Sequence, residues 1–164
     1  MVLSSRKKAA RESWIPNHLW NQVKRYMPIP CLDVVLENSL GEVLIGWRRI
    51  PPYRNVWALP GGRFHKGERI QEAAERILAE YDLSVRELFL VGVFPIGFPS
   101  RFDLSICVAS SAPDGRGVSD GKEFSALRWT KHLPKKLGKN YRQMILRWQR
   151  LKSSSEALKL NKLT

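Results

Sequence analysis

The sequence contains little of what marks a secreted, zinc-binding or membrane-spanning protein. It has two cysteines and three histidines among 164 residues, and no apolar run reaches the roughly 20 residues that a membrane-spanning helix needs. Cys31 and Cys107 lie in apolar, strand-like segments with no histidine nearby, which indicates buried free thiols rather than a disulfide or a zinc site. The basic N-terminal segment lacks the apolar stretch of a secretory signal, so we predict a cytoplasmic protein without membrane contact.

Acidic residues are also scarce, with 15 against 28 lysines and arginines, for a net charge of +13. The excess lies at the two ends of the chain. Residues 1–26 carry six basic residues and one acid, and residues 131–164 carry ten and one. Residues 27–130 carry twelve basic and thirteen acidic residues. Basic ends suit contact with nucleic acid, but they suit solubility equally well, so nucleic acid is a possible partner that we do not favour.

Apolar segments separated by turns rich in glycine and proline predict several strands and fewer helices. Residues 31–36 and 42–48 are expected to form a hairpin, and Pro95–Arg101 is expected to be a loop that borders a pocket. The other predicted strands lie at 56–59, 87–94, 102–110 and within 123–130, and the predicted helices at 14–27, 68–82 and 140–159. This order of elements predicts a mixed sheet with helices packed on it.

The most informative stretch is LPGGRFHKGERIQEAAERILAEYDL, residues 59–83. It opens with Pro60-Gly61-Gly62, a tight turn whose glycines let the backbone approach a ligand closely. The polar residues spaced four apart on one face of the helix that follows are Glu68, Glu72, Arg76 and Glu80. Carboxylate oxygens beside a phosphate suit magnesium or manganese. Glu–Arg pairs at this spacing are also common on solvent-facing helices, and the helix alone favours that simpler interpretation.

The spacing of the whole stretch nonetheless resembles the Nudix box. The family pattern is Gly, five residues, Glu, seven residues, then Arg-Glu-hydrophobic-any-Glu-Glu-any-Gly-hydrophobic. The positions that match are Gly62, Glu68, Arg76, Leu78 and Glu80. The positions that depart, where the family has two glutamates, a glycine and a hydrophobic residue, are Ile77, Tyr81, Leu83 and Ser84. The frame of the box is therefore present, and its set of acids is reduced.

The resemblance extends beyond the box. From Pro30 to about Leu78 the sequence is similar to the GDP-mannose mannosyl hydrolase branch of the Nudix family, in the segments LDVVLENSLGEVLIGWR, W-x-x-PGGR and EAAER. That branch also lacks the glutamate after the box arginine, where Ile77 stands here. The resemblance implies an α/β fold, the Nudix α/β/α sandwich with a mixed β-sheet. The expected parts are a basic N-terminal helical extension at 1–27, a Nudix domain at 28–138, and a basic C-terminal helix and tail at 139–164.

The resemblance further implies a hydrolase that uses Mg2+ or Mn2+ and acts on a nucleoside diphosphate linked to another group, such as a nucleotide sugar. The residues carried over by position as catalytic are Arg76, Glu80 and Glu123. Those carried over for the substrate are Asp33, at the base or sugar, and Arg48 and Arg63, at the diphosphate. The metal set is the Gly61 carbonyl with Glu68, Glu80 and Glu123, of which Glu80 is the main carboxylate. Arginine suits the diphosphate because guanidinium groups make forked hydrogen bonds to phosphate oxygens.

Two departures from the mannosyl hydrolase branch bear on the chemistry. That branch has a Gln-His pair before its last strand, with the glutamine on the metal and the histidine as general base. Aligned on Arg128-Trp129, this chain has Glu123 and Phe124 there. Phe124 cannot accept a proton, whereas Glu123 could bind the metal or activate water. The branch also places its ligand glutamate five residues after the box arginine, and here Glu80 follows Arg76 by four.

These departures leave three interpretations open. The first is a metal-dependent hydrolase, with attack at phosphorus slightly favoured over attack at sugar C1 because the histidine base is missing. The second is a catalytically weak or inactive module that binds nucleotide or RNA, with basic ends that make its affinity depend on salt. The third is a homodimer joined through the terminal helices that carry tryptophan. Acids near a phosphate would repel it without a metal, and this favours the hydrolase.

Overall fold

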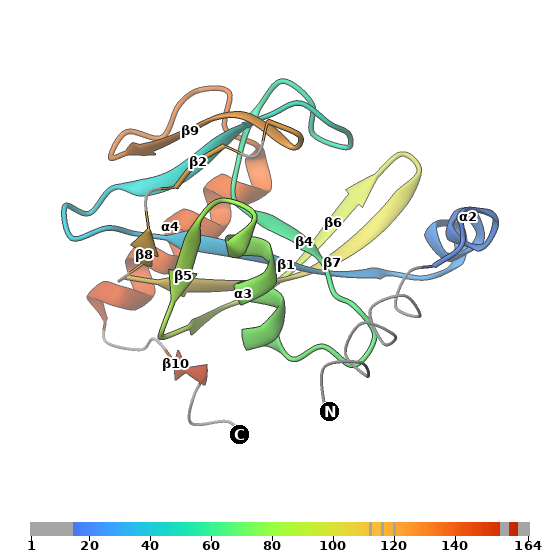
Figure 1. Ribbon diagram of the computed structural model, residues 1–164, viewed down its shortest axis with the longest axis horizontal. Coiled ribbons are helices and arrows are strands. Elements are labelled where there is room, and N and C mark those ends of the chain that lie inside the picture. Colours follow the sequence, from blue (N-terminus) through green and yellow to red (C-terminus); the bar gives the residue numbers. More distant parts are fainter. Residues whose placement is uncertain (1–14, 112, 116, 120, 155–157, 161–164) are drawn as a thin grey trace, which may run out of the picture.

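The computed structural model describes residues 15–111, 113–115, 117–119, 121–154 and 158–160. Its largest element is a five-stranded mixed sheet (Figure 1). The strands in order across this sheet are β10 (Leu158–Lys159), β6 (Phe89–Phe98), β7 (Arg101–Ser110), β1 (Ile29–Leu36) and β4 (Gly61–Arg63). β1 runs parallel to β7, and the other neighbours are antiparallel. Every residue of β1 except Pro30 is buried, as its nearly continuous apolar run requires.

The other elements surround this sheet. A three-stranded antiparallel sheet contains β3 (Trp57–Ala58), β2 (Val43–Arg48) and β9 (Phe124–Thr130), and a two-stranded ribbon contains β5 (Leu83–Val85) and β8 (Pro113–Gly115). The helices of the described residues are α2 (Asn17–Tyr26), α3 (Ile70–Ala79) and α4 (Lys139–Ser153). In Figure 1, α3 lies in front of β1 and α4 behind it. The predicted α/β fold with a mixed sheet and packed helices is confirmed.

The hairpin predicted from residues 31–36 and 42–48 is wrong, although both strands exist. β1 and β2 are linked by a single bridge between Glu37 and Val43 and then join different sheets. The turn itself is well formed, because the Asn38 side chain accepts hydrogen bonds from the backbone N–H groups of Leu40 and Glu42. The strands separate after this turn because each pairs with strands distant in sequence. β1 pairs with β4 and β7, and β2 pairs with β3 and β9.

Residues 95–101 do border a cavity, as predicted, through Ile96, Phe98 and Arg101. They do not form the predicted loop, because β6 continues through Pro95 to Phe98 and β7 begins at Arg101. Proline has no N–H and is tolerated in a strand only where the lost donor faces an unpaired edge. Among the described residues, β10 reaches β6 only at Phe89 and Leu90. The edge beside Pro95 is therefore unpaired in the described part of the chain, and the proline fits there.

The predicted basic C-terminal helix contributes side chains to the core. α4 buries four large side chains, namely Tyr141, Met144, Ile145 and Trp148. The Trp148 indole donates a hydrogen bond of 2.7 Å to Glu37, which follows β1 directly. Burial of each such side chain contributes roughly 1.5–3 kcal/mol. This packing argues for a domain that includes α4 rather than ends at residue 138, and the expected tail lies partly outside the described residues.

The N-terminal helix is attached differently. α2 has no buried residue; Leu19 on it is 42% exposed, and Met27, which follows it directly, is 59% exposed. Residues 1–14 of the expected extension lie outside the described part of the chain.

Both cysteines are buried and free, which confirms the interpretation of two thiols. None of the helices within the described residues is long and apolar enough to cross a membrane.

Candidate active site

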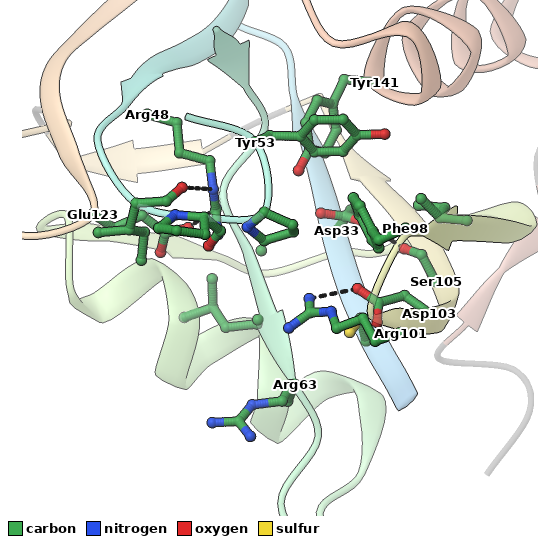
Figure 2. Close-up of a pocket in the computed structure, with 18 of the residues that line it drawn as sticks. Asp33, Arg48, Tyr53, Arg63, Phe98, Arg101, Asp103, Ser105, Glu123 and Tyr141 are labelled. Atoms are coloured by element: carbon green, nitrogen blue, oxygen red, sulfur yellow. Dashed lines mark hydrogen bonds and ion pairs between the residues drawn. The ribbon is translucent and has the colours of Figure 1, made fainter. Parts of the chain in front are cut away.

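A cavity of about 540 Å³ lies where the two main sheets and α3 meet. Its lining includes most of the residues that the sequence selected, namely Asp33, Arg48, Gly61, Arg63, Arg76, Glu80 and Glu123. Glu68 is not among the lining residues. Figure 2 shows Arg48 and Glu123 together on one side of this cavity, with Asp33, Arg101 and Asp103 on the other.

The sheet register explains why residues distant in sequence meet here. In the pairing of β1 with β4, Asp33 lies opposite Gly61 and Cys31 lies opposite Arg63. In the pairing of β1 with β7, Cys31 lies opposite Ser105. Residues directly opposite one another, and those two positions along, share a face of a sheet. One wall of the cavity is therefore formed by odd-numbered residues of the three strands, namely Cys31, Asp33, Gly61, Arg63, Arg101, Asp103 and Ser105.

Gly61 is required by this register. A Cβ atom at this position would lie 2.8 Å from the carbonyl oxygen of Leu32 and would clash with the Asp33 carboxylate. Real Cβ atoms do not approach so closely, so only glycine lets β4 pair with β1 beside a carboxylate. The backbone of β4 at Gly61 and Gly62 consequently reaches the cavity without a side chain in the way.

Asp33 is a buried carboxylate on the wall formed by β1. Its side chain accepts a short hydrogen bond from the Ser105 hydroxyl, and the residue is 7% exposed. Burial raises the pKa of Asp33 from 3.8 to about 6, against the opposing effects of the Ser105 hydrogen bond and the positive charge of Arg48. The buried charge thus destabilises the folded protein at neutral pH and is kept for a purpose other than stability.

This shift predicts how stability depends on pH. A folded-state pKa above the unfolded value means that the folded protein binds the proton more tightly, so stability falls as pH rises from about 4 to about 6. We expect Asp33→Asn to raise the free energy of unfolding at pH 7.5 by about 3 kcal/mol, with little gain at pH 4. Urea unfolding at both pH values, without divalent metal, measures this. The exposed Glu87→Gln variant is the control, and an equal gain for Asp33→Asn at both pH values would contradict the shift.

Glu68 and Arg76 form a forked ion pair behind the cavity. Arg76 Nε lies 2.6 Å from Glu68 Oε1, and Arg76 Nη2 lies 2.9 Å from Oε2. Glu68 Oε2 also accepts from the backbone N–H of His65, and Arg76 donates to the carbonyl of Arg63. Burial alone would raise the pKa of Glu68, but the hydrogen bonds from Arg76 and His65 outweigh it and hold that pKa below its ordinary value. This network ties α3 to the loop after β4, and it engages both oxygens of Glu68.

The two glutamates of the predicted metal set that line the cavity have different surroundings. Glu80 caps the C-terminal end of α3 and is exposed. Glu123 forms an ion pair with Arg48 and accepts a hydrogen bond of 3.2 Å from the Tyr81 hydroxyl. Arg48 also donates to the carbonyl of Ile50 at 3.1 Å. Tyr81, which stands where the family has a glutamate, therefore supplies a donor that holds Glu123 in place.

Phe124 does not face the cavity. It is fully buried against Tyr81, with ring centroids 5.4 Å apart, and it fills the space left by the missing side chain of Gly46. The position that carries a histidine base in the mannosyl hydrolase branch is thus a core position here. Glu123 precedes Phe124 by one residue and lies on the cavity side. It is the ionisable group nearest to Phe124 in the sequence.

The oxygen donors around the cavity fit a magnesium-type ion. Within the described residues, no three His, Cys, Asp or Glu side chains lie close enough together to hold a metal by themselves. Mg2+ in proteins commonly uses one or two carboxylates, keeps several waters and takes its other ligands from substrate phosphates. The Gly61 carbonyl, Glu80 and Glu123 border one cavity and supply donors of this type.

The structure adds three polar residues that sequence reasoning missed, Arg101, Asp103 and Ser105 on β7. Arg101 Nη2 lies 2.6 Å from Asp103 Oδ2, and these side chains are 20% and 7% exposed. Arg101 Nε and Asp103 Oδ1 have no hydrogen-bond partner within the described residues. Unsatisfied buried polar atoms in a cavity wall suit a polar ligand or water. The available signal was the alternation of Asp103 and Ser105 with Phe102 and Leu104, which places both polar residues on one face.

Comparison with known proteins identifies the family of the chain. Residues 27–147, well over half of the chain, match the family model of the NUDIX domain. The chain therefore belongs to the Nudix family. The matched region extends into α4, in line with the packing of that helix.

Individual relatives are more distant. The chain is 33% identical over 66 residues to the low-salt glycan biosynthesis protein Agl8 of Haloferax volcanii, covering 40% of this chain and 42% of that protein. It is 31% identical over 105 residues to an RNA pyrophosphohydrolase of Azorhizobium caulinodans, covering 62% and 61%. Each match thus spans less than two thirds of the relative. The crystal structure of a MutT NUDIX hydrolase from Burkholderia pseudomallei superposes with a TM-score of 0.67 at 21% identity, covering 74% of this chain and 98% of that one.

Proposed function

We propose that the protein is a divalent-metal-dependent hydrolase of a nucleoside diphosphate linked to another group, and that this group is a sugar. The observation that carries the proposal is the meeting of the Gly61 carbonyl, Glu80, Glu123 and Arg63 around one cavity of about 540 Å³. Membership of the Nudix family supports the reaction class. The similarity to a glycan biosynthesis protein over 66 residues supports a nucleotide sugar, such as a GDP-mannose-like compound.

The residues divide into three roles in this proposal. Mg2+ or Mn2+ would be held by the Gly61 carbonyl with Glu80 and Glu123, and would neutralise charge on the leaving phosphate. Arg63 binds a phosphate through its guanidinium group. Glu68 acts through Arg76, which also donates a hydrogen bond to the carbonyl of Arg63 and so fixes the strand that carries both Gly61 and Arg63.

Arg48 and Asp33 complete the substrate contacts. The ion pair of Arg48 with Glu123 links a proposed phosphate-binding residue to a proposed metal-binding one. Asp33, Asp103 and the Ser105 hydroxyl offer oxygen acceptors along one wall. Such acceptors suit the hydroxyl groups of a sugar or the N–H groups of a base. Glu123 is placed to accept a proton from water, because a carboxylate is a workable general base.

We expect attack at phosphorus rather than at sugar C1, because the position of the histidine base is occupied by the buried Phe124. Incubation of a panel of nucleotide sugars in 18O-labelled water, with and without Mg2+ or Mn2+, tests this by chromatography and mass spectrometry. Attack at phosphorus gives nucleoside monophosphate and sugar phosphate, with the label in one phosphate. Free labelled sugar and nucleoside diphosphate would instead mean attack at C1 and would overturn this part of the proposal.

A second candidate function is nucleotide or RNA binding with little or no turnover. The observation in its favour is that Glu123 is already paired with Arg48 and that no three-residue metal cluster exists among the described residues. Binding without product for every compound in the panel, at metal concentrations that saturate binding, would favour it. Salt-dependent RNA binding that survives Glu80→Gln would identify RNA as the ligand. A homodimer is compatible with either function, and sedimentation analysis of the full chain tests it.

A further inference from the structure

One residue of the cavity wall comes from outside the region that matches the family. Trp20 lies on α2, before residue 27, and it lines the cavity together with Arg63. α2 contributes no fully buried residue, but its half-buried Trp20 and Val23 line a smaller adjoining cavity with Ile29. Trp20 also lines the main cavity, and its position there has a local explanation.

The local explanation is the contact between Trp20 and Arg63. The central guanidinium carbon of Arg63 lies 4.2 Å from the centroid of the indole, and Lys24 Nζ lies 5.8 Å from the same centroid. Both distances fall within the roughly 6 Å over which a cation is attracted to an aromatic face. The indole is therefore the centre of a small group of cations at the edge of the cavity.

The contact changes how Arg63 interacts with an anion. Burial is the largest cause that lowers the pKa of Arg63, followed by the positive charge of Arg101 on the same wall. A ring packed on the guanidinium removes water from one face, restricts its orientation and leaves its N–H groups directed around its edge. A donor that is already oriented and partly desolvated loses less entropy when it binds a phosphate.

We propose that Trp20 is a positioning residue for substrate binding, whose ring holds the Arg63 guanidinium at the edge of the cavity to bind a phosphate group of the substrate. The proposal rests on the proposed function, because it takes the diphosphate as the anion that Arg63 binds. It makes α2 a part of the functional unit, although the family region begins at residue 27.

A double-mutant cycle in the full-length protein tests the proposal, with inorganic pyrophosphate and Mg2+ as the probe in isothermal titration calorimetry. We expect Trp20→Leu to weaken binding roughly 5- to 30-fold, the range that a partly desolvated cation–π contact supports, and Trp20→Phe to retain most of the affinity. In the Arg63→Ala background, Trp20→Leu should have no further effect, because the two residues act together. Leu19→Ala is the control on the same exposed helix.

Several results would overturn the proposal. One is an unchanged affinity in Trp20→Leu, and another is an equal loss in the presence and absence of Arg63. Thermal melting of each variant shows whether the fold is kept. If Trp20→Leu fails to fold, the affinity of Trp20→Phe for pyrophosphate tests the role of Trp20 instead. With a substrate identified, the proposal also requires KM to rise with kcat unchanged. If no compound is turned over, the proposed hydrolase fails, whereas the calorimetric cycle needs no turnover and still decides the role of Trp20.

Discussion

Replacement of Glu80 by glutamine is expected to lower kcat/KM by at least about 100-fold, because loss of a residue that only supports a metal ligand already costs roughly 10- to 100-fold. Glu80 caps the end of α3 and is exposed, so the variant keeps its packing. Its melting temperature should stay within about 2 °C of the wild-type value, as for surface substitutions in general. Steady-state hydrolysis at several Mg2+ concentrations, together with thermal melting, measures both effects.

The matched control is Glu75→Gln on the same helix, where the exposed carboxylate accepts a hydrogen bond from Gln71 and does not line the cavity. Its activity should equal that of the wild type. The Mg2+ dependence adds a second criterion, because loss of a metal ligand should move the activation curve to higher Mg2+. Wild-type activity in Glu80→Gln would remove this residue from the site, and the metal set would then have to be rebuilt around Glu123.

The second large effect is expected for Glu123→Gln. A glutamine side chain cannot accept a proton, so kcat should fall roughly 100- to 10,000-fold if Glu123 is the general base. The variant also leaves the guanidinium of Arg48, which is 13% exposed, without its counter-charge. Loss of one partner of a partly buried ion pair should lower the free energy of unfolding by about 1–3 kcal/mol. Steady-state assays with the best substrate measure the change in kcat, and urea unfolding measures the change in stability.

Tyr81→Phe separates the position of Glu123 from its charge. The variant removes only the hydroxyl that donates to Glu123 and leaves the buried ring packed on Phe124. We expect a small reduction in kcat, well below that of Glu123→Gln, because the ion pair with Arg48 remains. If Tyr81→Phe and Glu123→Gln reduced kcat equally, the carboxylate would be acting through its position alone and not as a base.

The part of the site that the sequence predicts correctly is local in the chain. The helix that carries Arg76 and the match to the Nudix family both follow from spacing within about twenty-five residues, whereas the tight turn predicted at Pro60-Gly61-Gly62 is wrong, because both glycines lie in β4. Local spacing fixes which side chains share one face of a helix, and tertiary packing does not alter that. The helix is shorter than predicted, Ile70–Ala79 instead of 68–82, because its ends depend on hydrogen bonds that residue types do not reveal.

The parts that the sequence does not predict depend on pairing between distant strands. Arg101 and Asp103 join the site because β7 lies parallel to β1, and no turn between neighbouring segments specifies that arrangement. The same long-range pairing separates β1 from β2 at Glu37. No role for Trp20 follows from the sequence, and its contact with Arg63 depends on how α2 is placed against β4. The sequence predicts the helix of α4 from its apolar pattern, but the burial of four of its side chains depends on its packing against the sheet.

Pro95 has a consequence for how the protein behaves at high concentration. An unpaired strand edge is a template on which strands of other chains can add, and this is a common start of aggregation. A proline on that edge removes a backbone donor from the template, so growth of the sheet past β6 is disfavoured there. The hairpin of β6 and β7 can thus expose Val93, Phe102 and Leu104 to solvent, at 54%, 43% and 39%, without inviting another strand to join the sheet. Any self-association through this region would have to use side-chain contacts. Such contacts are reversible, so the associated species should dissociate when the protein is diluted.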